Sequence, residues 1–306
     1  MAMESAQVIT ASDAELGLEP SSSQRGMLRR AGEVFVENRL ALAGLGFIVF
    51  ILLFCFIGPH LYVTNQVDTD LINSLCTPGS QHLLGCNELG YDELGRLMVG
   101  GQTSIEVGLA AAVVSVLIGT LYGAISGFAG GFIDSVMMRI VDAGLSLPSL
   151  MVIIILSVIF HPTPVVIVFI IAVFYWFGVA RLVRGETLSL RNREYVQAVK
   201  VIGGRPLRSV VRHIVPNAIG TIIVQATFAV ADSILTLSVL GFLTLGVAPP
   251  ATDWGSMLSG GLTYIQGGNY WWLIYPPGVL IILTCISFNF IGDALRDAFE
   301  TRLQRR

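Results

Sequence analysis

The sequence predicts an all-α, polytopic membrane protein with six transmembrane helices. Of its 306 residues, 54% are apolar and only 13% are charged, whereas soluble domains contain about 25% charged residues. Six stretches are apolar enough, and long enough, to span a bilayer, which takes roughly 20 residues in a helix. The basic residues gather in alternate connections between these stretches, as expected of a chain that crosses a membrane repeatedly.

The six predicted spans cover residues 41–62, 103–126, 136–160, 164–183, 218–243 and 273–292. The third carries Arg139 and Asp142 near its start and is interrupted by Pro148, so its membrane part is expected to begin late. We divide the chain into a disordered N-terminal tail at 1–35, a first helix with an external loop at 36–102, and a permease core of five helices at 103–306. The tail is acidic and poor in large apolar residues.

The basic residues also predict the orientation. Seventeen of the 18 lie before the first span, at Arg139, in the 181–217 loop or after the last span. Arg96, in the 63–102 loop, is the exception. Because cytoplasmic segments retain Lys and Arg, both termini and the 181–217 loop are predicted to be cytoplasmic, and the 63–102 and 247–272 segments external.

A repeat of glycines marks the end of the second span. Gly119, Gly123 and Gly127 are four residues apart, which keeps them near one helix face and lets a neighbouring helix approach closely. We predict a packing seam there. The alternative is that these glycines only loosen the end of the span, since Gly130 and Gly131 are typical of a turn.

The basic loop between the fourth and fifth spans is the most informative segment. Residues 194–216 read as two short helices with apolar flanks, separated by Gly203 and Gly204 as cap and turn and by Pro206 at the start of the second. A cytoplasmic helical pair with exposed apolar flanks suggests a docking site for a protein partner. The alternative is an interfacial helix on anionic lipid.

Gln197, Ala198 and Val199, with Gly203 and the Val215–Pro216 dipeptide, resemble the EAA loop of binding-protein-dependent ABC importer permeases. Gln197 replaces the family's Glu, Val199 its second Ala, His213 its Ile and Val215 its Leu. Further resemblance to the dipeptide and oligopeptide permease family, specifically its C-type subunit, lies in four stretches: GCNELGYDELGR at 85–96, GFAGGFIDSVMMRIVDAGLSLPSL at 127–150, VAPPATDWG at 247–255 and GDALRDAFETRL at 292–303.

The resemblance implies a type I ABC importer permease fold in a bacterial inner membrane, and peptide transport by alternating access. It also implies several partners: a homologous permease subunit, two ATPase subunits that bind ATP and Mg, and an external solute-binding protein. The 184–217 loop would then be the coupling loop, contacting an ATPase through Gln197, Ala198, Val199, Gly203, Gly204, Arg205, Pro206, Leu207 and Pro216. No cofactor is expected in this chain.

Nothing in the sequence indicates catalysis. The phosphate-binding pattern G-x-x-x-x-G-K-[ST] is absent, and the one lysine, Lys200, has no glycine-rich loop before it. His60, His82 and His161 are predicted outside and His213 inside, so the histidines cannot converge. ATP is therefore expected to be hydrolysed by partner subunits.

Three other features stay open from the residues alone. Cys76 and Cys86 share the external loop, where a disulfide, free thiols or a metal site with His82 are the alternatives. Cys55 and Cys285 lie in spans and are expected to pack. Asp232 lies within the fifth span, where a carboxylate either faces a cavity or partner, or lies near enough to the interface to be hydrated.

Permeases of the same family for glutathione or nickel chelates share the motifs, so the sequence leaves these solutes open as alternatives to peptides. Two other rival functions are weaker. An ion-driven secondary transporter would normally show internal repeats or intramembrane ion sites, and Asp232 alone gives thin support. A membrane enzyme subunit lacks any nucleophile, metal cluster or cofactor motif.

Overall fold

A computed structural model describes residue 32 and residues 35–160, 163–193, 210–264 and 268–300, and these residues contain helices but no strand. The elements are α3 (Arg39–Phe56), α4 (Gly58–Leu61), η1 (Leu71–Asn73), α5 (Glu93–Ala129), α6 (Gly131–Ser146), α7 (Ser149–Ile159), α8 (Pro164–Leu190), η2 (Val210–Ile214), α11 (Val215–Asn217), α12 (Ile219–Phe242), α13 (Trp254–Leu262), η3 (Trp271–Leu273) and α14 (Tyr275–Glu300).

Five of the six predicted spans contain a stretch of helix that is long enough to cross a membrane. Within the described residues, the stretches long and apolar enough to cross a membrane are α3, α5, α8, α12 and the segment Trp271–Phe299 that holds α14. Polar side chains fix several of their starts. Asn38 Oδ1 accepts hydrogen bonds from the main-chain N–H groups of Leu40 and Ala41 at the start of α3, and Asp92 accepts one from Gly95 at the start of α5.

The third predicted span, residues 136–160, is not one helix. It is broken into α6 and α7, whose axes meet at 82°. Leu147, at the break, has an extended conformation (φ −82°, ψ 139°). The cause is Pro148, which offers no N–H to continue the α6 ladder and disfavours a helical conformation in the residue before it. The bundle therefore has five continuous spans and one bent pair.

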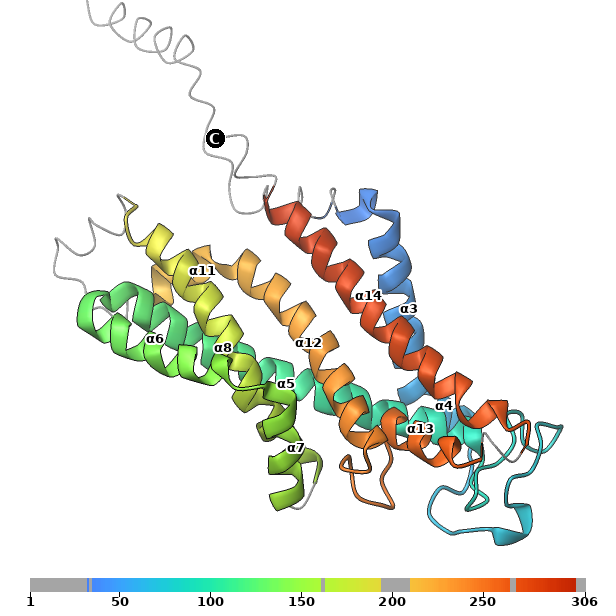
Figure 1. Ribbon diagram of the computed structural model, residues 1–306. Coiled ribbons are helices and arrows are strands. Elements are labelled where there is room, and N and C mark those ends of the chain that lie inside the picture. The colour runs from blue at the N-terminus through green and yellow to red at the C-terminus, as the bar shows by residue number, and fades with distance from the viewer. Residues whose placement is uncertain (1–31, 33–34, 161–162, 194–209, 265–267, 301–306) are drawn as a thin grey trace, which may run out of the picture.

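Helix α5 is the longest of the described helices and runs across the bundle, in contact with α8, α12 and α3 (Figure 1). It packs along α8 on one side and against α12 on the other, while α14 lies between α12 and α3. Gly44 of α3 lies so close to α14 that a Cβ there would be 2.9 Å from the Ser287 carbonyl oxygen. A second close contact fixes α13 to the start of α5, where the buried Trp254 donates its indole N–H to the Leu97 carbonyl at 3.0 Å.

The bundle has two chemically different ends. At one end lie Arg39 at the start of α3, the α5–α6 turn and the end of α8; we call it the arginine end. At the opposite end lie α4, α13, the starts of α5 and α14, and the 63–92 loop; we call it the disulfide end. The predicted topology makes the arginine end cytoplasmic and the disulfide end external.

Candidate functional site

The predicted coupling loop is anchored at both ends in one hydrophobic core. The described chain stops three residues after α8 and resumes at η2, a short π-helix, where Val210 is 2% exposed and Ile214 is fully buried. These two side chains belong to the same core cluster as Ala124 of α5 and Val183 of α8. Because close-packed cores transmit displacement rather than absorb it, a force on the loop would reach α5, α8 and α12 together.

An ion pair reinforces this anchor on the polar side. Arg184 donates from Nε to Asp134 Oδ1 and from Nη2 to Asp134 Oδ2, both at 2.6 Å, and the Ser126 hydroxyl donates to Oδ1 at 2.5 Å. Asp134 is 7% exposed and lies in the first turn of α6. Two parallel N–H to oxygen bonds fix the relative orientation of the two side chains. The pair thus joins α5, α6 and α8 at the arginine end.

The predicted glycine seam lies between α5 and α8. A Cβ on Gly119 would be 2.6 Å from Val179 Cβ, and one on Gly127 would be 2.9 Å from the Arg184 carbonyl oxygen. At Gly123 a Cβ would come within 2.3 Å of the Ala180 carbonyl oxygen. The seam is therefore a backbone-to-backbone contact with α8.

The turn after α5 also packs against α8. Gly130 and Gly131 have positive φ values of 66° and 54°, which side-chain-bearing residues adopt with difficulty. Arg191, directly after α8, donates from Nη1 to the Gly127 carbonyl at 3.0 Å and closes this turn onto α8. The end of α8, which forms the first part of the predicted coupling loop, is thereby fixed to the turn after α5.

Most of the predicted ATPase-contact residues lie outside the described residues: Gln197, Ala198, Val199, Gly203, Gly204, Arg205, Pro206 and Leu207. The two short helices predicted for this segment lie largely there as well. Pro216 is described; it is exposed, in the short helix α11 that follows η2.

Asp232 and Glu106 are two of the exposed carboxylates within the spans. Asp232 is exposed on α12, on the same face as Leu235, which is 51% exposed. Beside it, the Tyr175 hydroxyl of α8 is 2.7 Å from the Thr236 hydroxyl and 3.4 Å from the Asp232 carbonyl oxygen. Glu106 is likewise exposed on α5. The described part of this chain covers neither carboxylate, and an intramembrane carboxylate normally faces protein or water.

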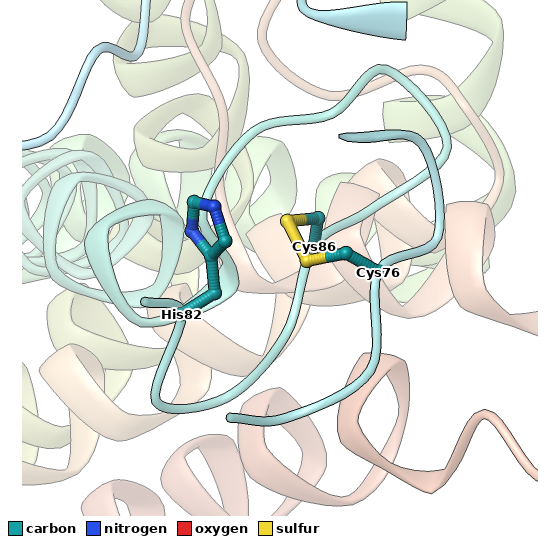
Figure 2. Close-up of side chains that lie close together, drawn as sticks. All are labelled: Cys76, His82 and Cys86. Carbon is teal, nitrogen blue, oxygen red and sulfur yellow. A yellow bond between two sulfur atoms is a disulfide. The ribbon is translucent and has the colours of Figure 1, made fainter. Parts of the chain in front are cut away.

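At the disulfide end, Cys76 and Cys86 are joined by a disulfide, with Cα atoms 4.9 Å apart. Figure 2 shows the bonded sulfur atoms beside the His82 ring. Among the described residues, Cys76, His82 and Cys86 are the one group of three with the spacing of metal ligands. The bonded sulfurs offer no thiolate, and His82 Nδ1 lies 2.9 Å from Asp92 Oδ2. This arrangement favours a structural loop over a metal site.

Asp92 connects the predicted external loop to the start of α5 through hydrogen bonds. Besides His82, it accepts a hydrogen bond from the Tyr62 hydroxyl at 2.9 Å. Burial, followed by this hydrogen bond to a carboxylate, raises the pKa of Tyr62.

Among the described residues, Cys55 is a buried free thiol in α3, and the half-buried Cys285 of α14 contacts the Ala231 carbonyl at 3.6 Å, so both pack as predicted.

Sequence reasoning missed several polar residues that the fold brings together. Asp134 and Arg184 are 50 positions apart, and neither has a distinctive local pattern. Glu106 was missed although it lies inside a predicted span, where any carboxylate is a usable signal. Glu93 lies at the start of a helix, and only tertiary contacts bury it.

Comparison with known proteins gives consistent matches. Residues 119–305 match the profile described as "Binding-protein-dependent transport system inner membrane component", and residues 26–78 match "N-terminal TM domain of oligopeptide transport permease C". The dipeptide transport system permease protein DppC of Bacillus subtilis is 40% identical over 269 residues, covering 88% of this chain and 84% of the relative. The oligopeptide transport system permease protein OppC of Escherichia coli K12 is 40% identical over 280 residues, covering 91% and 92%.

One solved structure shows the fold. A chain of the MetNI methionine ABC transporter, in an inward-facing conformation, aligns with a TM-score of 0.54 at 16% identity. The alignment covers 66% of this chain and 96% of the other. The bundle therefore has the fold of an ABC importer permease, as predicted.

Proposed function

Since this chain belongs to the family of binding-protein-dependent transport system inner membrane components, we propose that it is a permease subunit of an ATP-driven importer of dipeptides or oligopeptides. One observation carries the substrate class: relatives aligned over most of both chains at 40% identity are named dipeptide and oligopeptide permease proteins. These names favour peptides over glutathione or nickel chelates. The family and fold likewise disfavour an ion-driven secondary transporter.

In this proposal the chain forms half of the translocation pathway and a homologous permease subunit forms the other half. Two ATPase subunits bind ATP and Mg and supply the energy, and an external solute-binding protein delivers the peptide. The exposed carboxylates Asp232 and Glu106 support the shared pathway, because a second subunit or the water between the subunits would keep them from lipid.

The coupling step follows from how the 184–217 loop is anchored. An ATPase that moves residues 197–207 would displace the end of α8 and the start of η2 together. The Asp134–Arg184 pair joins α8 to α6 and the glycine seam joins α8 to α5, so the displacement would tilt a group of helices rather than bend one. Alternating access would then arise from movement of α5, α8 and α12 against the partner subunit.

The proposed location is the bacterial cytoplasmic membrane, with both termini and the coupling loop in the cytoplasm. The seventeen-to-one distribution of basic residues supports this orientation. The disulfide Cys76–Cys86 supports it as well, because an external loop lies in an oxidising compartment where such bonds persist.

Uptake by the purified complex tests this function. The complex is isolated from its native membrane through a tag on this chain, reconstituted in liposomes with its binding protein, and given labelled dipeptide, oligopeptide, glutathione or nickel chelate. We expect uptake of dipeptide or oligopeptide, and we expect it to require ATP on the side of the membrane that holds the ATPase subunits. Uptake driven by an ion gradient without ATP, or uptake of glutathione or nickel chelate but no peptide, would contradict the proposal.

A further inference from the structure

A cavity of about 400 Å³ lies at the disulfide end of the bundle. The first turn of α5, the end of α12 and α13 surround it, together with loop residues 87–89 and residues of the 244–252 loop. Its volume falls within the range of about 300–1,000 Å³ that is typical of pockets for small ligands. Its charged lining residues are Glu88, Glu93 and Arg96, and we call it the Glu93 cavity.

Glu93 presents a buried carboxyl group without a partner in the wall of this cavity. It is 2% exposed, and its carboxylate has no hydrogen bond or ion pair to any residue that the structure describes. A buried carboxylate without a partner is costly, because the lost hydration is not replaced. Buried charges in proteins are normally paired, so the wall of this cavity lacks a positive partner.

The neighbouring arginine does not supply that partner. Arg96 is 8% exposed, and its guanidinium carbon lies 4.6 Å from the centre of the Tyr91 ring. Its Nη1 donates to the Pro250 carbonyl at 3.3 Å. These contacts hold the guanidinium against Tyr91 and the 244–252 loop, beyond ion-pair distance from Glu93.

The charges of the lining residues define the kind of ligand. The guanidinium of Arg96 is held by Tyr91 and Pro250, so the wall offers the two carboxyl groups to a ligand. A cation is the ligand that favours the ionised form of buried carboxyl groups. A bare metal ion fits poorly: among the described residues, the one group of three side chains with metal-ligand spacing is Cys76, His82 and Cys86, none of which lines the cavity. The remaining class is an organic cation whose N–H groups donate to a carboxylate.

We propose that the Glu93 cavity binds the free ammonium group of a peptide as it enters the permease, with Glu93 as the counter-ion and Glu88 as a second acceptor. This inference rests on the proposed function, because the predicted topology places the cavity at the external end, where the binding protein would release a peptide. The Glu88 side chain lies against α13, with Oε1 3.3 Å from the position of a Cβ on Gly260. Both carboxylates thus line the same space.

Calorimetric titration of the assembled complex, without its external binding protein and without nucleotide, tests the inference. Two probes separate the charged ends of a peptide: alanyl-alanine amide has an ammonium but no carboxylate, and acetyl-alanyl-alanine has a carboxylate but no ammonium. We expect the first probe alone to bind. Glu93→Gln should weaken its binding about tenfold or more, as expected when a hydrogen bond to a charged group is lost. Asp68→Asn, an exposed carboxylate in the same external loop, should have no effect.

A second variant covers the case in which Glu93→Gln fails to assemble. Gly260→Leu keeps Glu93 and fills the cavity beside Glu88, so it should also abolish binding of alanyl-alanine amide. Equal binding of the two probes by the unmodified complex, or unchanged binding by either cavity variant, would overturn the inference. If the complex bound alanyl-alanine amide through Glu93 but took up no peptide, the result would contradict the proposed function and leave this inference standing.

Discussion

Arg184 of α8 and Asp134 of α6 form a two-bond ion pair, with Nε to Oδ1 and Nη2 to Oδ2 distances of 2.6 Å. The pair lies where α8 leads into the 184–217 loop, and Ser126 of α5 completes it. Three helices therefore meet through one carboxylate next to the proposed coupling element.

Removing this carboxylate should destabilise the protein. Asp134→Ala leaves the Arg184 guanidinium, which is 31% exposed, without its acceptor, and we expect a loss of about 1–3 kcal/mol in the free energy of unfolding. Thermal unfolding of the purified complex measures it. Asp142→Ala is the control, because the Arg181–Asp142 pair has side chains more than half exposed and such pairs contribute about 0–1 kcal/mol. Equal losses in the two variants would contradict the special role of Asp134.

The glycine seam makes a second prediction. In Gly123→Ala the new methyl group would lie 2.3 Å from the Ala180 carbonyl oxygen, so α5 and α8 must separate. Overpacking of this kind costs about 1–3 kcal/mol, and transport should fall with it. Gly178→Ala is a matched control on α8, because a Cβ there meets nothing within 4 Å. The seam would be disproved if Gly123→Ala were as stable and active as Gly178→Ala.

Asp232 gives a third prediction, which concerns the pathway. If its carboxylate faces a partner subunit or water, Asp232→Leu should disturb transport or the pairing of the permease subunits, while Asp232→Asn should be milder. A carboxylate facing lipid would instead cost about 2.5–3.5 kcal/mol on membrane-insertion scales, and leucine would relieve that cost. Uptake rate and the recovery of the paired subunits distinguish the two. Higher stability with unchanged uptake in Asp232→Leu would place Asp232 against lipid.

The sequence predicted the spans well because spanning a membrane depends on local hydrophobicity. For this reason residues 218–243 correspond closely to α12, and residues 164–183 lie within α8, which continues to Leu190. The break of the third span was also visible at Pro148, but the resulting angle depends on how α7 packs against α8, which no local pattern reveals.

Residues whose role depends on distant partners were harder to predict. The spacing of Gly119, Gly123 and Gly127 indicated a seam without indicating that α8 forms its other side. Glu93 and Asp134 resemble ordinary acidic residues of a helix's first turn until tertiary contacts bury them. The resemblance to the EAA loop indicated the coupling segment, although residues 194–209 lie outside the described structure.

Site-directed cross-linking shows whether the 184–217 loop joins this chain to an ATPase subunit. Single cysteines replace residues from Ala198 to Leu207 in a chain whose Cys55 and Cys285 are serine, and a bifunctional thiol-to-amine reagent is applied to the assembled complex. A cysteine in the external loop, in place of the exposed Asp68, is the negative control. We predict cross-links from the 198–207 positions to the ATPase, with yields that change when nucleotide binds. Absence of any ATPase cross-link from these positions, in a complex that still hydrolyses ATP and takes up peptide, would show that this segment does not couple the chain to the ATPase.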